Sequence, residues 1–259
     1  MKRNTNKIIF ILIWIIIIIL VFFSKYWYYL TKQEIIDYIS QQTIIKEVKQ
    51  DPEVITVFVE REQMNSDNYS NIKLDINYIY QNPELPTGCE VTALTIILNY
   101  LGYDIDKTTM ADLFLPKGEI GKTDPDVAFI GNPRDKNSYG ANAPVLEKTA
   151  NDYLSKVESD YHAYNITGTD FNDLKKYIID GYPVMIWGTI DMKEPYPSTK
   201  WIIDNKEIQW YARFHCVVLI GWTEETYIVA DPLVGITEYD KDIVLQRYNQ
   251  LGKQAVVIY

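Results

Sequence analysis

The chain has 259 residues, of which 47% are hydrophobic and 14% aromatic. This composition is typical of a folded protein with a sizeable core and excludes a disordered chain. The formal net charge is −10 at pH 7. Residues 1–32 carry five basic side chains and no acidic one, so the remainder has 20 basic against 35 acidic groups, a net charge of −15. Nucleic acid and an anionic membrane surface are therefore not expected partners of this acidic body.

The first element is an uncharged apolar run from Ile8 to Phe23. Extended to Leu30, it reaches about 20 residues or more, enough to cross a bilayer. The basic residues before it place the N-terminus in the cytoplasm, and aromatic residues follow on the far side. A cleaved secretory signal is the alternative, but no small-residue cleavage site follows the run. We expect residues 1–30 to be a single-pass signal anchor in the cell membrane, which places the rest of the chain outside the cytoplasm.

Residues 31–70 are expected to form a stalk or linker of one helix and one strand. The spacing of Thr31 and Glu34 predicts a helix N-terminus, and the apolar periodicity predicts a helix over about 32–49. The β-branched segment Val54–Val59 predicts a strand, and residues 60–70 are polar. Whether this helix packs on the body or stands apart is left open.

The body is predicted to span residues 71–259. Alternation over Ile72–Tyr78 predicts a strand, and the residues after Cys89 predict a helix that ends before Gly102. Helices are expected over Val145–Leu154 and Asp170–Asp180. Strands are expected over Pro183–Ile190, Phe214–Trp222, Thr226–Ala230 and Gln254–Tyr259. Residues 116–142 and 191–212 are expected to be long loops. Because helices come first and antiparallel strands follow, the predicted fold class is α+β.

Cys89 stands at the beginning of the predicted helix. Thr87 and Glu90 have the spacing of a capping box, which would make Thr87 the N-cap and place Cys89 in the first turn. The free N–H groups there favour a thiolate and are expected to lower the pKa of Cys89. The neighbouring Glu90 opposes this effect.

A cysteine nucleophile needs a base, and the chain has two cysteines and two histidines. Cys216 adjoins His215 on a predicted strand, so their side chains point to opposite faces. His162 lies in a polar stretch with no partner pattern. The combination that remains is Cys89 with His215. A Cys89–Cys216 disulfide is the alternative expectation for an extracytoplasmic domain, whereas a zinc site lacks suitable ligand spacing.

Two further residues complete the predicted site. The hairpin of strands 214–222 and 226–230 brings Asp231 near His215, where its carboxylate would hold Nδ1 and fix the tautomer. Gln81 precedes Cys89 by eight residues and would donate a side-chain N–H to an oxyanion, beside the backbone N–H of Cys89. Cys216 would then face the core. The aromatic residues Trp201, Trp210 and Tyr211 either line a substrate groove or cover the sheet.

The whole pattern resembles the C39-like cysteine peptidase family, within the papain-like peptidases. The resemblance covers most of residues 72–259. It rests on Gln81 with Leu85–Leu94, on Phe129–Pro133 with Tyr139 and Gly140, on His215–Gly221, on Asp231–Leu233 with Gly235, and on Gly252–Val256. It implies a papain-like fold, with the helix that carries Cys89 packed on an antiparallel sheet that carries His215 and Asp231. The implied roles are nucleophile for Cys89, base for His215, orienting group for Asp231 and oxyanion donor for Gln81.

The better-known branch of this family is fused to an ATP-driven exporter and removes double-glycine leaders. The present sequence has no G-x-x-x-x-G-K-[ST] motif and one predicted membrane span, so this role is not expected. The resemblance implies hydrolysis of peptide bonds without a metal or other cofactor, acting on a peptide or protein substrate. A thiol amidase or acyltransferase, or an inactive module that binds a peptide or cell-wall partner, would use the same framework. The oligomeric state is left open.

Overall fold

The computed structural model of the chain describes residues 48–51, 54–57 and 70–259. The chain divides into two compact units, residues 1–64 and 65–259. In the first unit, β1 (Val48–Asp51) and β2 (Val54–Val57) pair antiparallel, with Val48 opposite Val57. The predicted helix over 32–49 is wrong at its end, because Val48 and Lys49 belong to β1; the β-branched Val48 favours a strand. The rest of that helix and the predicted anchor at 1–30 lie outside the described residues.

Among the described residues, no helix has the length and apolarity needed to cross a bilayer.

The second unit is built on a seven-stranded sheet in the order β12-β11-β10-β7-β13-β6, with β3 paired to the far end of β10. All its pairings are antiparallel. Its strands are β3 (Ile72–Lys73), β6 (Ala163–Asn165), β7 (Val184–Thr189), β10 (Phe214–Trp222), β11 (Thr226–Asp231), β12 (Gly235–Asp240) and β13 (Ala255–Ile258).

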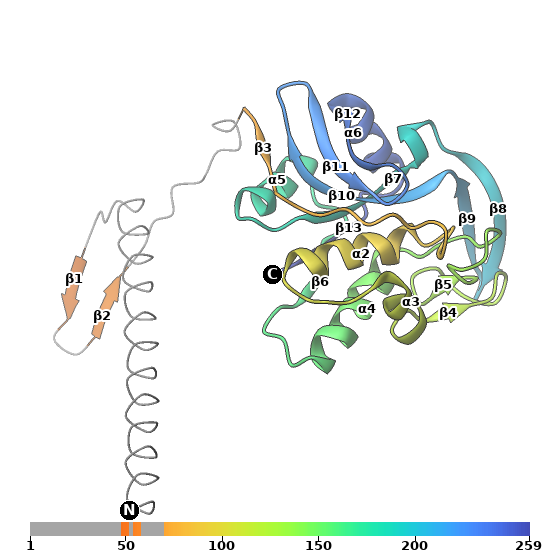
Figure 1. Cartoon of the computed structure of the whole chain (residues 1–259), viewed down its shortest axis with the longest axis horizontal. Helices are drawn as coiled ribbons and strands as arrows, with labels where there is room; N and C mark the ends of the chain where they lie inside the picture. The colour runs from red at the N-terminus through yellow and green to blue at the C-terminus, as the bar shows by residue number, and fades with distance from the viewer. Residues whose placement is uncertain (1–47, 52–53, 58–69) are drawn as a thin grey trace, which may run out of the picture. The chain divides into compact units, whose positions relative to one another are not determined.

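Helices cover both faces of this sheet (Figure 1). On one face, side chains of the sheet pack with α2 (Cys89–Tyr100), α3 (Lys107–Leu113) and α4 (Ala143–Lys156). On the other face, they pack with α5 (Phe171–Ile179) and α6 (Lys241–Gln250). The α+β class and the papain-like arrangement of a cysteine-bearing helix on an antiparallel sheet are thus as predicted.

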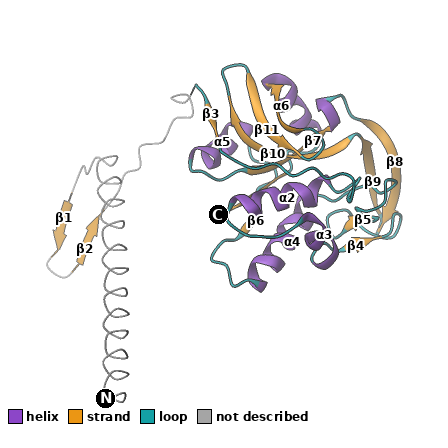
Figure 2. Cartoon of the chain, viewed as in Figure 1, coloured by secondary structure: helices purple, strands orange, loops and turns teal. Residues whose placement is uncertain are grey.

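The central strand β10 is apolar along nearly its whole length because both of its faces are buried. Cys216, Val218 and Ile220 join the core under α2, whereas Val217 and Leu219 join the core under α5 and α6. A strand buried on both sides loses the alternation of an ordinary surface strand. This packing explains the unbroken apolar run and fixes α2 directly against β10 (Figure 2).

The predicted loop at 191–212 is wrong. Apart from a short 3-10 helix at Ile190–Met192, this segment forms the antiparallel hairpin of β8 (Tyr196–Ile203) and β9 (Lys206–Ala212). The turn residues Asp204 and Asn205 both have positive φ, as two-residue hairpin turns require. The other predicted loop, 116–142, contains the short parallel pair β4 (Lys117–Gly118) and β5 (Phe129–Ile130).

Outside the two predicted loops, four elements of the described body were not predicted: α3, β6, β12 and α6. In addition, the strand predicted over Ile72–Tyr78 is hydrogen-bonded as β3 only at residues 72–73. Immediately after it, the N–H of Leu74 still donates to the carbonyl of Ile220 at 2.8 Å. Gly221 permits this approach, since a Cβ there would lie 2.1 Å from the carbonyl oxygen of Ile72. The other predicted helices and strands of the body are present within two residues of their expected ends.

Candidate active site

Helix α2 begins at Cys89, one residue later than the predicted capping box requires. Gly88 is the N-cap, and Thr87 does not cap the helix: its hydroxyl donates to the carbonyls of Asp135 at 2.8 Å and Pro133 at 3.3 Å. Gly88 has to be small, because a Cβ there would lie 2.7 Å from Cβ of Leu85. Cys89 therefore occupies the first position of the helix, at the end where backbone N–H groups lack intrahelical partners.

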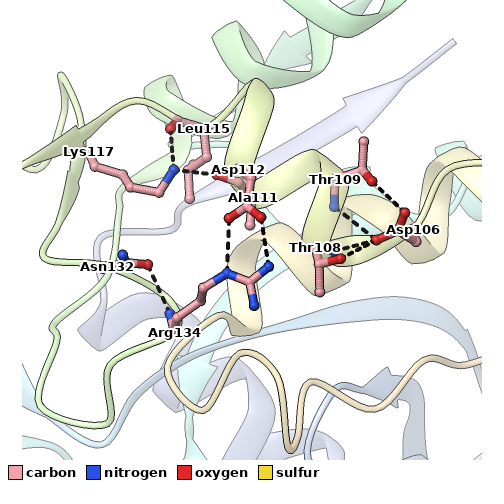
Figure 3. Close-up of polar contacts among 9 residues, drawn as sticks. All are labelled: Asp106, Thr108, Thr109, Ala111, Asp112, Leu115, Lys117, Asn132 and Arg134. Atoms are coloured by element: carbon pink, nitrogen blue, oxygen red, sulfur yellow. Dashed lines mark hydrogen bonds and ion pairs between the residues drawn. The ribbon is translucent and has the colours of Figure 1, made fainter.

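The segment 132–135, whose carbonyls accept hydrogen bonds from the Thr87 hydroxyl, is held by helix α3 (Figure 3). The Arg134 guanidinium makes a two-point contact with Asp112 on α3, at 3.0 and 2.7 Å, and its backbone N–H donates to Asn132 Oδ1 at 3.1 Å. Asp106 caps α3 by accepting from the N–H groups of Thr108 and Thr109, each at 2.9 Å. The entry to α2 is thus connected through hydrogen bonds to a second helix, which holds Cys89 in place.

His215 and Asp231 form a buried pair on the neighbouring strands β10 and β11. His215 Nε2 lies 2.8 Å from Asp231 Oδ1, and each residue is 2% exposed. The same Oδ1 accepts from the N–H of Leu233 at 2.8 Å, and the Tyr239 hydroxyl donates to Oδ2 at 3.4 Å. Burial disfavours the Asp231 carboxylate, but the contacts with His215 and the other donors outweigh burial and lower its pKa.

The contact differs from the prediction in the ring atom involved. We expected Asp231 to hold Nδ1 of His215, whereas it holds Nε2. Antiparallel pairing places Val218 opposite Ala230, so Asp231 lies two positions along the sheet from the residue that faces His215. Which ring atom meets the carboxylate depends on the side-chain torsions, which sequence does not specify.

Cys89, His215 and Gln81 line one cleft of about 320 Å³. The Cys89 sulfur also lies beside the backbone N–H of Cys216, the residue that follows His215. The cleft further contains side chains of the β9–β10 segment and of the loop before α4, namely Tyr139, Trp210, Tyr211, Arg213 and Phe214. Cys89 and His215 therefore come from different elements, the N-terminal end of α2 and the start of β10, and both line one cavity.

The pKa of the Cys89 thiol is raised, against the effect expected from the helix end alone. Burial raises it well above the ordinary value, and the nearby Glu90 charge raises it further. The thiol donates a hydrogen bond to Glu90 Oε2 at 3.2 Å. The sequence left the balance between the positive helix end and Glu90 open, and in this enclosed position desolvation and the adjacent carboxylate are the larger effects.

Gln81 lies near the cysteine as expected, but its amide has other partners. Nε2 donates to the carbonyls of Pro86 at 2.9 Å and Leu85 at 3.3 Å, and the buried Oε1 has no hydrogen-bond partner. Donation to an oxyanion would therefore replace the longer of these two bonds. Cys216 is a free, fully buried thiol of the core, as is appropriate for a strand residue that points away from His215.

Sequence reasoning underestimated the aromatic hairpin and missed the structural role of Glu90. Trp210 and Tyr211 line the cleft, whereas Trp201 is 8% exposed and stacks on Trp210 with ring centroids 6.3 Å apart. Trp201 packs with Ile130 and Ile208 in a small separate core, so the alternative that it covers the seven-stranded sheet does not apply to it. The clue was the alternation of apolar residues over Ile208–Tyr211, which indicates a strand with one covered face.

Comparison with known proteins identifies the family. Residues 73–256 match the family model described as Peptidase_C39 like family. The chain belongs to this family. A crystal structure of a candidate C39-like peptidase from Bacillus anthracis superposes with a TM-score of 0.67 at 29% identity, covering 74% of this chain and 98% of that one. The uncharacterised protein YvpB of Bacillus subtilis (strain 168) is 28% identical over 181 residues, which are 68% of this chain and 70% of YvpB.

Membership of this family gives the cleft a chemical meaning. Family members are named as peptidases, and a cysteine peptidase requires a thiol and an imidazole in one accessible cavity. Both groups are present here, with the imidazole held by a buried carboxylate. The C39-like fold and the family assignment thus agree with the resemblance first seen in the motifs around Cys89, His215 and Asp231.

Proposed function

We propose that the chain is a cysteine peptidase in which Cys89 is the nucleophile, His215 the base, Asp231 the orienting group and Gln81 a donor to the oxyanion. The observation that carries this proposal is the single cleft in which the Cys89 thiol and the buried His215–Asp231 pair meet. Membership of the C39-like family supports it.

The reaction begins with proton transfer. Since Asp231 occupies Nε2 of His215, Nδ1 is the ring atom that takes the proton of the Cys89 thiol. The sulfur attacks the carbonyl carbon of the peptide bond, and the carbonyl oxygen becomes an oxyanion that accepts from the Cys89 backbone N–H and Gln81 Nε2. Collapse of this intermediate breaks the C–N bond, and His215 returns the proton to the departing amine.

A thioester between Cys89 and the acyl half of the substrate remains. His215 then removes a proton from water, the resulting hydroxide attacks the thioester, and the proton returns to the sulfur as the acid product leaves. Because the pKa of the Cys89 thiol is raised, the nucleophile is neutral at rest, and the base acts during attack instead of maintaining a preformed thiolate. Asp231 stabilises the imidazolium that forms in each half of the cycle.

We further propose that residues 71–259 are the peptidase domain, that residues 1–30 anchor it in the cell membrane, and that it acts outside the cytoplasm. The support is the apolar run Ile8–Phe23 with basic residues before it. The substrate is accordingly an extracytoplasmic peptide or protein.

A non-catalytic binding module is the second candidate. Two observations favour it: the Cys89 thiol is held neutral by burial and by Glu90, and Gln81 Nε2 is engaged by carbonyls of its own loop. A module of this kind would use the aromatic cleft to hold a peptide and would have no need of a reactive sulfur.

Alkylation of Cys89 by iodoacetamide separates the two candidates without knowledge of the substrate. The rate is measured on the full-length chain in a mild detergent, with the modified residue identified by mass spectrometry. The peptidase proposal predicts that His215→Ala slows alkylation at pH 7 about tenfold or more, since the base is lost. The exposed His162 is the matched control, and His162→Ala is expected to have no effect. Equal rates in wild type and His215→Ala would contradict the proposal and favour the binding module.

A further inference from the structure

Glu90 is a buried carboxylic residue of the site to which the mechanism above gives no role. Its side chain is 0% exposed, although it stands next to the nucleophile in the first turn of α2. Oε2 accepts from the Cys89 thiol at 3.2 Å, and Oε1 accepts from the backbone N–H of Ala141 at 2.9 Å. Both oxygens are therefore placed by specific contacts, one of them with the reacting sulfur.

The second contact fixes the opposite wall of the site. Gly140 packs so closely that a Cβ there would lie 2.3 Å from Glu90 Oε1. The carbonyl of Ala141 in turn accepts from the Trp187 indole N–H at 3.0 Å. Glu90 thus connects α2 to the segment before α4, and a neutral side chain of the same shape would preserve this connection.

The titratable groups around Glu90 come from three elements. Cys89 lies on its own helix, Cys216 and His215 on β10, and Asp231 on β11 behind His215. Burial is the largest cause of the raised pKa of both thiols, and the Glu90 charge is the second. The positive form of His215 favours the Glu90 carboxylate. Protonation of Glu90 and of Cys89 is therefore linked.

We propose that Glu90 is a third proton-exchanging group of the active site, which opposes the Cys89 thiolate when ionised and donates a hydrogen bond to that thiolate when protonated. This inference rests on the proposed peptidase function and adds a residue to it. When Glu90 is ionised, the proton resides on the Cys89 sulfur, and Oε2 accepts a hydrogen bond from the thiol. In the active state the proton resides on Oε2, the sulfur is the acceptor, and the Ala141 contact is unchanged.

The proton balance sets the pH dependence. Burial raises the pKa of Glu90 to about 6, although the hydrogen bond from Ala141 opposes this change. The states with a neutral acid and a thiolate, or a carboxylate and a thiol, contain the same number of protons. Above about pH 6 the reactive population therefore stops rising with pH, until the raised thiol pKa itself is approached.

Glu90→Gln is the decisive variant. The amide oxygen can still accept from Ala141, and the amide N–H₂ stands where Oε2 stood and donates to the sulfur, as the protonated acid would. Alkylation is measured against pH in full-length chains that carry Cys216→Ala, so that Cys89 is the only thiol. Glu224, an exposed carboxylate on a turn, provides the control Glu224→Gln.

The proposal predicts that Glu90→Gln speeds alkylation at pH 7.5 about tenfold, because the thiol pKa falls when the neighbouring charge is removed. Glu224→Gln is expected to match the parent. An unchanged or slower rate in Glu90→Gln overturns the inference. His215→Ala in the same series tests the proposed function separately, because the loss of the base slows alkylation whatever Glu90 does.

If Glu90→Gln does not fold, as judged by circular dichroism, the parent chain still decides. The measurement is made with His215→Ala added, so that Glu90 is the remaining side chain in contact with the thiol that can exchange a proton with it. The proposal predicts that the logarithm of the alkylation rate flattens between about pH 6 and 8. A rise with unit slope through this interval means that Glu90 is not linked to the thiol, and the inference fails.

Discussion

Replacement of Asp231 tests how much the buried carboxylate contributes to the proposed base. Asp231→Asn keeps an oxygen that accepts from His215 Nε2 and from the N–H of Leu233, but it removes the charge. A hydrogen bond to a charged group contributes about 1.5–3 kcal/mol and a neutral one about 0.5–1.5 kcal/mol. The imidazolium of His215 therefore loses about 1.5 kcal/mol of stabilisation, which is about tenfold in rate.

Asp231→Ala removes the acceptor itself. The Nε2–H of His215 and the N–H of Leu233, both at 2.8 Å from Oδ1 in the wild type, are left without this partner. An unsatisfied buried donor costs about 1–3 kcal/mol, and the Leu233 N–H is only part-buried, so the free energy of unfolding is expected to fall by about 2–4 kcal/mol. The imidazole also loses its orientation, and the rate is expected to fall about a hundredfold or more.

The assay is the alkylation rate of Cys89 at pH 7, with urea unfolding measured on the same samples. Both the alkylation rate and the free energy of unfolding are predicted to fall from wild type to Asp231→Asn and again to Asp231→Ala. Asp160→Asn, at an exposed carboxylate, is the control and should match wild type in both. Alkylation in folded Asp231→Ala at the wild-type rate would refute the idea that the His215–Asp231 contact serves the thiol.

Three further predictions follow from the same contacts. Because the folded-state pKa of Glu90 is raised from 4.5 to about 6, the stability that its protonated form contributes is fully present below about pH 4.5 and lost as the pH rises through 6; this loss, about 2 kcal/mol, should appear in urea unfolding of wild type and vanish in Glu90→Gln. Gly140→Ala should destabilise the fold by about 2 kcal/mol or more, since φ is +149° and the new Cβ would meet Glu90 Oε1. Gly102→Ala, with φ +95° and open space, should cost only about 1 kcal/mol when both variants are compared by urea unfolding, and equal losses would contradict the steric argument. Cys216→Ala should leave the alkylation rate of Cys89 within about twofold, because Cys216 is a core residue; abolished labelling on peptide mapping would mean that Cys216 is the reactive thiol.

The sequence predicts the parts of this fold that are encoded by local periodicity. The helix after Cys89 and the hairpin of β10 and β11 follow from apolar spacing, and Gly102 ends α2 with positive φ as a C-terminal glycine does. The hairpin β8–β9 was missed because polar and charged residues interrupt its alternation. Helix α6 was missed because its apolar face is limited to a few residues such as Val244 and Tyr248.

The candidate site shows the same division between local and tertiary information. The identities of Cys89 and His215 follow from an inventory of two cysteines and two histidines, and the hairpin brings Asp231 near. The raised pKa of the Cys89 thiol does not follow, because it depends on burial and on the direction in which Glu90 points. The capping-box spacing of Thr87 and Glu90 was misleading, because both side chains bond to residues distant in sequence, including Asp135 and Ala141.

Cleavage of a peptide library tests the central claim most directly. A digest of a whole proteome is incubated with the full-length chain or with Cys89→Ala, and new amino termini are identified by mass spectrometry. The account predicts new termini that share a sequence preference with wild type and none with Cys89→Ala. Absence of new termini with wild type, or the same termini with both proteins, would contradict the assignment of Cys89 as the nucleophile of a peptidase.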